Sequence, residues 1–249
     1  MHPEINAFII GGMKCGTTSL AGVLGAHPRI CLSRPKEAHY FDYPRVQFGG
    51  VESDDLEKHF GHFNGESVVL DATPAYVFMP GSIDAILRYN PNAKFILILR
   101  SPIDRAISHF GHELHRGTEK LPFLLALCLE PWRLWRDRKN PLRGKSAWRR
   151  NSYVSRGLYF GQVRSLLSKT GNVHVVSFRE LIADTERTLA GIYQFLEIEP
   201  NKIPSSLPKR NSKAPTRGYP FVRRLLNLRF LRDARRTEAL LGWPRGSLS

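Results

Sequence analysis

Short apolar runs alternate with longer amphipathic stretches along the chain. The runs predict strands at residues 6–10, 68–70, 95–99 and 173–176. A periodicity of three to four residues predicts helices at 17–26, 53–63, 82–89, 104–116, 123–129, 159–168 and 184–196. The run from Phe95 to Leu99 is apolar at every position, which is typical of a parallel strand buried on both faces. Strands that alternate with helices predict an α/β fold of three layers, in which helices flank a central parallel sheet.

The length predicts one domain, and the charge distribution marks two basic segments within it. At 249 residues, one α/β domain can close a sizeable core, so we expect a single domain over residues 1–249. One basic segment is an insert at about 130–150, and the other covers about 208–249 and is expected to begin irregularly. Ligands of open α/β sheets bind at the carboxyl ends of the strands, so the site is expected there.

The formal net charge is +15, from 37 lysine and arginine residues against 22 aspartate and glutamate residues. Such a charge attracts polyanions, so a basic nucleic-acid-binding module is one interpretation of the chain. The other interpretation is that the molecules the chain binds are acidic. Trp132, Trp135 and Trp148 lie among arginines, where they can stack on sugars or bases, or pack as part of an amphipathic helix.

The sequence predicts a cytoplasmic enzyme or a domain excised from a larger protein. No apolar run reaches the roughly 18–20 residues that cross a bilayer, and no signal peptide precedes the first predicted strand. The three cysteines, Cys15, Cys31 and Cys128, are too widely spaced for a zinc motif or a disulfide framework. We therefore expect a soluble protein in a reducing compartment.

The segment from Phe8 to Leu20 carries the strongest chemical signal. A strand, a glycine loop and a helix start follow one another, which is a layout that binds phosphate through backbone N–H groups and the helix dipole. A nucleotide-triphosphate loop reads GxxxxGK[ST], but Thr17 stands at its lysine position and the lysine lies earlier, at Lys14. The loop therefore favours a phosphate-like donor other than a triphosphate with Mg²⁺. A P-loop kinase acting with Mg-ATP stays an alternative, because Asp71 ends a buried run as a Walker B aspartate does.

The letters GGMKCGTTS at residues 11–19 resemble the 5′-phosphosulfate loop of sulfotransferases that use 3′-phosphoadenosine 5′-phosphosulfate (PAPS). That loop reads roughly GxxKxGTT, and the likeness is greatest to heparan-sulfate glucosaminyl sulfotransferases and to similar bacterial enzymes. The resemblance implies that the 5′-phosphate is bound by Lys14, Cys15, Gly16, Thr17, Thr18 and Ser19. It also implies that Lys14 neutralises the departing phosphate.

Two further segments resemble the family's nucleotide-binding parts. RSPIDRAIS, from Arg100 to Ser108, matches R-x-P-x-x-R-x-x-S, which implies that Arg100 and Ser108 hold the 3′-phosphate. Arg105 of this motif is interpreted as either a phosphate-site residue or a surface or helix-stabilising residue. A late basic loop, RNSKAPTR, resembles the segment that closes over the nucleotide, with Asn211, Lys213 and Arg217 reaching the phosphates.

The stretch EAHYFD resembles the E-x-H-F-F-D segment of heparan-sulfate 3-O-sulfotransferases, in which the glutamate is the catalytic base. Glu37 is therefore the candidate base, and burial is expected to raise its pKa toward the working pH. The alternative is a surface glutamate paired with Lys36 or Arg34. His39 shares the catalytic role, orients the acceptor, or is a packed structural residue.

The residues DATPAY, which begin at Asp71, resemble a further family segment, although Ala72 replaces a frequent lysine. Together these likenesses imply a sulfotransferase that moves the sulfuryl group of PAPS in line to a hydroxyl or amine and releases 3′,5′-ADP. No metal is required by this scheme, and no nucleic-acid partner is expected. The basic insert favours an acceptor that is acidic or contains sugar.

Overall fold

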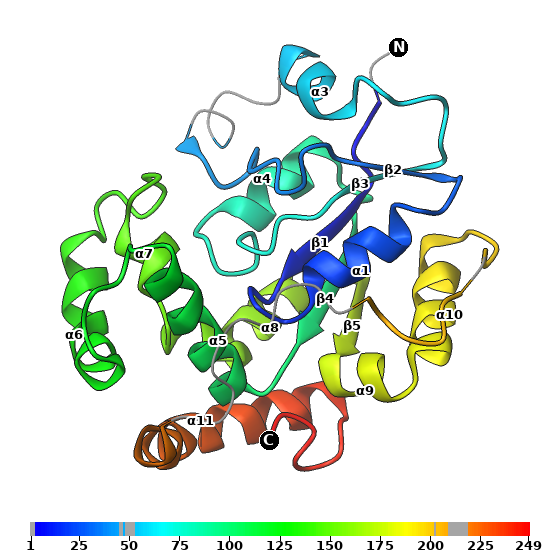
Figure 1. Ribbon diagram of the computed structural model, residues 1–249. Coiled ribbons are helices and arrows are strands. Elements are labelled where there is room, and N and C mark those ends of the chain that lie inside the picture. The colour runs from blue at the N-terminus through cyan, green and yellow to red at the C-terminus, as the bar shows by residue number, and fades with distance from the viewer. Residues whose placement is uncertain (1–2, 45–46, 48–52, 202, 209–218) are drawn as a thin grey trace. The chain divides into compact units, whose positions relative to one another are not determined.

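Figure 1 shows the computed structural model of the chain, which describes all residues except 1–2, 45–46, 48–52, 202 and 209–218, and only the backbone of 53–55. The chain forms two compact units, each built from two stretches of sequence. Unit 1 comprises Met1–Leu99 and Thr170–Arg210, and unit 2 comprises Arg100–Lys169 and Asn211–Ser249. The prediction of a single domain stays a prediction.

Unit 1 is built on a five-stranded parallel sheet with the order β2-β3-β1-β4-β5. Its strands are β1 (Ala7–Gly11), β2 (Ile30–Leu32), β3 (Val68–Asp71), β4 (Lys94–Leu99) and β5 (Val173–Ser177). Its helices are α1 (Thr17–Leu24), α3 (Ser53–Phe60), α4 (Ser82–Tyr89), α9 (Phe178–Ala183) and α10 (Thr185–Leu196). Because β1 lies in the middle, the loop that follows it emerges at the centre of the sheet's carboxyl edge.

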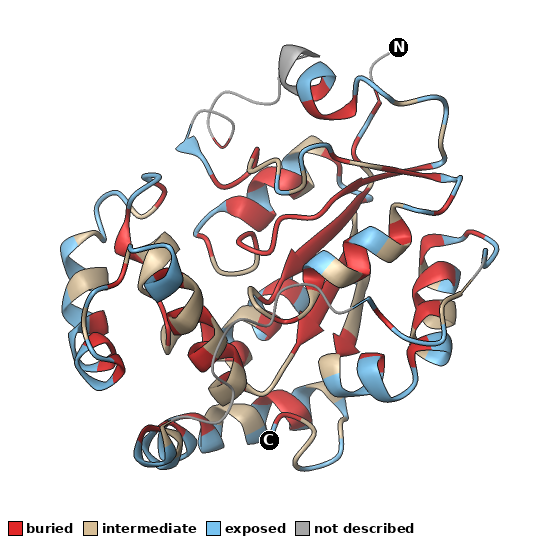
Figure 2. Ribbon diagram, viewed as in Figure 1, coloured by how far each residue is buried: buried red, intermediate tan, exposed pale blue. Residues whose placement is uncertain are grey.

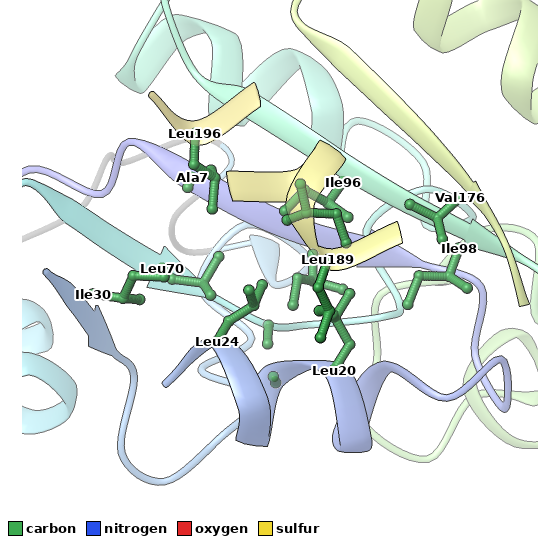
Figure 3. Packing of buried hydrophobic residues seen from close by; sticks show 14 of the residues in the cluster. Ala7, Leu20, Leu24, Ile30, Leu70, Ile96, Ile98, Val176, Leu189 and Leu196 are labelled. Carbon is green, nitrogen blue, oxygen red and sulfur yellow. The ribbon is translucent and has the colours of Figure 1, made fainter. Parts of the chain in front are cut away.

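The two faces of the sheet are covered differently. On one face, alternate residues of β1 and β4 pack against leucines of α1 and α10 in an aliphatic core (Figure 3). On the other face, Phe8 stacks on Phe95, with ring centroids 5.8 Å apart, and meets Phe41 edge-on at 5.6 Å. Phe41 in turn contacts Tyr89 of α4. Burial on both faces explains why β1 and β4 lack the alternation of polar residues seen in half-exposed strands.

Unit 2 contains helices and no strand in its described part. These are α5 (Pro102–His115), α6 (Phe123–Arg136), α7 (Ala147–Arg150), the short 3₁₀ turn η1 (Ser155–Gly157), α8 (Tyr159–Leu167) and α11 (Pro220–Leu241). Its core joins α5, α6 and α11 through Phe110, Phe123, Tyr153 and Phe230. Phe110 stacks on Phe123 with ring centroids 4.4 Å apart.

The predicted fold class is confirmed, since helices flank a parallel sheet whose strands match the apolar runs. The short elements β2, α7 and α9, and the long helix α11, were not predicted. The helix predicted at 123–129 continues to Arg136 through Pro131, because proline removes one N–H donor but keeps a helical φ. The irregular start predicted for the tail falls largely on residues 209–218, outside the described part.

Replacement of Leu189 by Ala is expected to lower the free energy of unfolding by about 2–5 kcal/mol, because Leu189 is buried where α10 covers the sheet. Leu228→Ala, at an exposed position of α11, is the matched control and is expected to change it by less than about 0.5 kcal/mol. Urea unfolding measures both. Equal losses in the two variants would contradict the placement of α10.

Candidate functional site: the loop after β1 and the loop after β2

The loop after β1 is shaped for the approach of an anion. The Cys15 N–H donates to the Gly12 carbonyl over 3.0 Å within the turn, and the Gly12 N–H donates to the Ile98 carbonyl of β4. Lys14 and Gly16 adopt left-handed backbone conformations, with φ of 69° and 88°. A Cβ on Gly16 would lie 2.5 Å from the Phe178 ring, so glycine is required there for space as well as for conformation.

The amino terminus of α1 supplies N–H groups at the end of this loop. Gly16 is the N-cap and has no side chain with which to satisfy them, and the helix dipole adds partial positive charge there. Thr17 is buried and Thr18 is exposed, while the half-buried Ser19 donates its hydroxyl to the Pro208 carbonyl over 2.9 Å. This helix end therefore suits an anionic group, as the loop sequence predicts.

Lys36 connects α1 to the loop that follows β2. Its Nζ lies 3.3 Å from the Thr18 Oγ1 and 3.0 Å from the Glu37 Oε1. Glu37 is 43% exposed, and its second oxygen lies 3.5 Å from the His39 Nε2. The alternative of an ion pair between Glu37 and Lys36 is thus what the structure shows. The same pair contacts Thr18 of α1, the helix whose amino terminus is predicted to bind the phosphosulfate, so the pair belongs to the candidate site.

His39 is held between two carboxylates. Its Nδ1 lies 2.9 Å from the Oδ2 of the fully buried Asp42, and its Nε2 faces Glu37. Burial alone would lower the pKa of His39, but the contacts with Asp42 and Glu37 outweigh burial and raise it to about 9. The imidazole is therefore positively charged at neutral pH and orients Glu37 from one side.

The expectation that burial raises the pKa of Glu37 is wrong. Burial acts in that direction, but the hydrogen bond from His39 and the charge and hydrogen bond of Lys36 together lower the pKa to about 2. Two cations beside one carboxylate stabilise its ionised form. In the arrangement seen here Glu37 is a stable carboxylate and a weak proton acceptor, which sets a condition on any mechanism that uses it as a base.

Asp71 is enclosed at the end of β3 by two hydroxyl groups. Thr73 Oγ1 donates to one carboxylate oxygen over 2.8 Å and the Tyr76 hydroxyl to the other over 2.6 Å. Burial raises the pKa of Asp71, although both hydrogen bonds oppose the shift. A Walker B aspartate is directed toward Mg²⁺, whereas both carboxylate oxygens of Asp71 are engaged by hydroxyl groups, so these contacts disfavour the kinase alternative.

Thr73 extends the network back to the loop after β2. Its Oγ1 also accepts a hydrogen bond from the His39 N–H over 3.4 Å. A continuous chain of contacts therefore runs from Asp71 through His39, Glu37 and Lys36 to Thr18. The sequence indicated neither the contact of Lys36 with Thr18 nor that of Asp42 with His39. The available signals were the position of Lys36 beside Glu37 and that of Asp42 three residues after His39.

The predicted 3′-phosphate residues lie in unit 2. Arg100 directly follows β4 and is half-buried, and its carbonyl accepts a hydrogen bond from the Tyr159 hydroxyl over 3.0 Å. Ser108 is half-buried on α5. Arg105 is fully buried and donates to the Tyr153 carbonyl, so the interpretation of Arg105 as a surface residue is wrong. The predicted loop residues Asn211, Lys213 and Arg217 lie outside the described residues.

Two general features of the described residues bear on function. Histidine, cysteine, aspartate and glutamate side chains nowhere gather there in groups of three that could hold a metal ion. None of the helices in the described ranges is both long enough and apolar enough to cross a bilayer.

Comparison with known proteins identifies the family. The family described as "Sulfotransferase domain" matches residues 4–227. The chain belongs to the sulfotransferase family. Its P-loop-like fold is the fold of that family, and membership agrees with the resemblance of its loop sequence.

Solved and curated sulfotransferases give the same result. A sulfotransferase structure from Alicyclobacillus acidocaldarius is 29% identical, covers 99% of both chains and superposes with a TM-score of 0.79. Mouse "Heparan sulfate glucosamine 3-O-sulfotransferase 6" is 27% identical over 78% of this chain and 52% of its own length. "Membrane-associated sulfotransferase kil1" of Dictyostelium discoideum is 34% identical over 42% of this chain and 22% of its own. The chain thus spans about half of the length of these curated relatives or less.

The charged state of His39 is open to direct measurement. In an NMR titration, the His39 ring is expected to lose its proton near pH 9, and Asp42→Asn is expected to lower that midpoint. Because the folded pKa lies above the ordinary value of 6.5, the stabilising contribution of His39 is complete below pH 6.5 and is lost as pH rises through about 9. The stability difference between the native protein and His39→Gln measures this loss. A His39 ring that titrates near pH 6.5 in the folded protein would contradict its contacts with Asp42 and Glu37.

Proposed function

We propose that the enzyme transfers the sulfuryl group of PAPS to a hydroxyl or amine of an acceptor and releases 3′,5′-ADP. The bond from sulfur to the acceptor atom forms while the bond from sulfur to the 5′-phosphate oxygen breaks, and the acceptor proton passes to Glu37. The observation that carries this proposal is the contact of Lys36 with both Thr18 and Glu37. It joins an anion-binding helix end to the carboxylate that the family resemblance implies as the base.

On the donor side, the 5′-phosphate is bound by the first turn of α1 and its loop, from Cys15 to Ser19, and Lys14 neutralises the departing phosphate. Arg100 and Ser108 bind the 3′-phosphate, with Asn211, Lys213 and Arg217 as further phosphate ligands. The exposed Thr18, the uncapped helix end and the half-buried Arg100 support this assignment. In such transfers, most of the rate acceleration comes from hydrogen-bond donors and cations that are held where negative charge develops.

Lys36 makes Glu37 responsive to the donor. A donor bound at Thr18 draws the Lys36 ammonium away from Glu37, because a phosphosulfate carries more negative charge than a single carboxylate. Without that cation, the pKa of Glu37 rises toward the range in which a general base is effective. His39, fixed by Asp42, keeps the remaining oxygen of Glu37 oriented toward the acceptor.

For the acceptor, we propose a polar molecule that is acidic or contains sugar. Mouse and human relatives that are named "Heparan sulfate glucosamine 3-O-sulfotransferase" 5 and 6 support an acceptor that contains sugar. The net charge of +15 supports an acidic one.

Isothermal titration separates this function from the two alternatives. We expect 3′,5′-ADP to bind without added Mg²⁺, because arginine, lysine and backbone N–H groups supply the charge. Mg-ATP is expected to bind far more weakly, since Thr17 replaces the P-loop lysine. Binding of Mg-ATP alone would favour a kinase, and DNA binding that falls steeply with salt, without a nucleotide site, would favour a nucleic-acid module.

Replacement of Glu37 by Gln is expected to leave 3′,5′-ADP affinity nearly unchanged and to lower turnover about 10²–10⁴-fold, the usual contribution of a general base. Calorimetry measures the first quantity and a coupled assay of released 3′,5′-ADP measures the second. Glu57→Gln, at an exposed position of α3, is the matched control. A Glu37→Gln enzyme with a near-native rate would remove Glu37 from the base role.

Lys36→Met tests the link between donor binding and the base. The variant is expected to bind 3′,5′-ADP or PAPS about tenfold more weakly, the equivalent of one charge-assisted contact. Since Lys36 lowers the pKa of Glu37, its loss moves the acidic limb of the kcat/KM profile to higher pH. Lys58→Met, on the exposed side of α3, provides the comparison. An unshifted acidic limb would show that Lys36 does not control Glu37.

A further inference from the structure

Helix α6 has an apolar outer face that nothing in the described chain covers. The outer face of α6 is defined here by Leu125, Cys128, Leu129, Trp132 and Trp135, which share one side of the helix because each lies three or four residues from at least one other. All five are exposed, with 51% of Leu125, 55% of Trp132 and 60% of Trp135 open to solvent. Figure 2 shows the exposed residues along α6 at the edge of unit 2. The packing interpretation therefore accounts for Trp148, which is half-buried and donates to the Leu134 carbonyl, but not for the exposed area of Trp132 and Trp135.

The outer face is not the side by which α6 packs onto its own unit. Phe123, Ala126 and Leu127 are buried in the unit 2 core with Phe110 and Tyr153 of the neighbouring elements. Glu130 also points inward, where its carboxylate accepts the N–H groups of Val154 and Ser155 over 2.7 and 2.8 Å. A surface helix ordinarily has one apolar side, so a second one is unexpected and marks a contact surface.

Positive charge borders the outer face at its carboxyl end. Residues 133–150 contain eight lysines and arginines and one acid, Asp137, which pairs with Arg136 over 2.9 Å. The guanidinium groups of Arg136 and Arg138 lie over the rings of Trp132 and Trp135, 5.2 and 4.1 Å from the ring centroids. Lys139, Arg143 and Lys145 follow and are exposed. Leucine, tryptophan and arginine are thus ordered from apolar to cationic along the helix.

We propose that the outer face of α6 docks on an anionic lipid bilayer. The leucines enter the boundary between head groups and acyl chains, and the tryptophan rings lie at the interface, where one part of the ring is apolar and its N–H is polar. The exposed cations Lys139, Arg143 and Lys145 contact lipid phosphates. The acidic complement that this charge requires and the apolar layer that the leucines require are both present in such a membrane. This docking is independent of the proposed donor and acceptor and needs no membrane-spanning helix.

Two other occupants fit the surface less well. A sugar stacks on tryptophan but offers nothing to Leu125 and Leu129, which lack hydrogen-bonding groups. A partner protein would need an apolar groove with an acidic border. Both are retained as outcomes of the test below.

Co-sedimentation of the full chain with lipid vesicles tests the proposal without substrates. The protein is expected to bind vesicles of phosphatidylcholine mixed with phosphatidylglycerol and to bind pure phosphatidylcholine at least about tenfold more weakly. Leu129→Ser and Trp132→Ser are expected to lower binding about tenfold each, because polar groups replace buried apolar area. Ile182→Ser, at a position of α9 that is 56% exposed, is the matched control and is expected to have no effect. Thermal unfolding of each variant confirms its fold.

Charge and depth are measured separately. Lys139→Glu and Arg143→Glu are each expected to weaken vesicle binding by about fivefold or more. Added salt is also expected to weaken binding, because it screens the attraction between these cations and the lipid phosphates. Brominated lipids are expected to quench tryptophan fluorescence, and less so in the variant with both Trp132→Phe and Trp135→Phe.

Several results would overturn the proposal. They are absence of binding to the mixed vesicles, equal binding to neutral vesicles, and equal losses in Ile182→Ser and Leu129→Ser. If Trp132→Ser raises the KM for the acceptor and keeps vesicle binding, the outer face of α6 belongs to the acceptor site. Charge-reversal variants that lose an acidic protein partner but keep vesicle binding would assign it to a protein.

Discussion

The Lys36 ammonium group, shared between Thr18 and Glu37, is the interaction on which the candidate site depends. It joins two loops that leave the same edge of the sheet, one after β1 and one after β2. The far end of the network is anchored at the buried Asp71, whose two hydroxyl partners hold β3 to the segment that follows it. A buried carboxylate that is fully hydrogen-bonded is costly to disturb, so the network fixes the loop that carries Glu37 and His39.

The charges of this network explain a property that the identities of the residues alone do not. A partly buried glutamate is commonly expected to have a raised pKa, yet Glu37 has two cationic neighbours and a pKa lowered to about 2. Reactivity then becomes conditional, because the carboxylate gains basicity only when a cation leaves. A strongly anionic donor provides a reason for Lys36 to leave. In the proposed mechanism, this arrangement couples the presence of the donor to the removal of the acceptor proton.

Unit 2 shows how one helix can serve two surfaces. Phe123, Leu127 and the inward Glu130 attach α6 to its core, and no acidic side chain is left on the outer face of α6. More than half of the surface of Leu125, Trp132 and Trp135 is open to solvent, and this exposed area adds nothing to the packing of the unit. Hydrophobic residues at such positions are explained by a contact outside the unit, and the basic residues after them restrict the chemistry of that contact to something anionic.

Much of the chain was predictable because its signals are local. The loop GGMKCGTTS, the apolar strand FILIL and the motif from Arg100 to Ser108 each combine residue type with spacing along a few turns of chain, and they predicted the parallel sheet, the glycine loop and the family. The helix α6 was predicted too short, because the helix-breaking tendency of Pro131 was outweighed by packing of the residues on both sides of it.

The ionisation states of the site could not be predicted in this way. The sequence by itself determined which ionisable groups were available, namely Lys36, Glu37, His39 and Asp42. Only the tertiary structure decided that Lys36 reaches Thr18, that His39 lies between two carboxylates, and that Asp71 is enclosed by hydroxyl groups. The physical reason is distance: electrostatic and hydrogen-bonding energies depend on separations of a few ångströms between side chains, and those separations are set by how the strands pair and the loops fold.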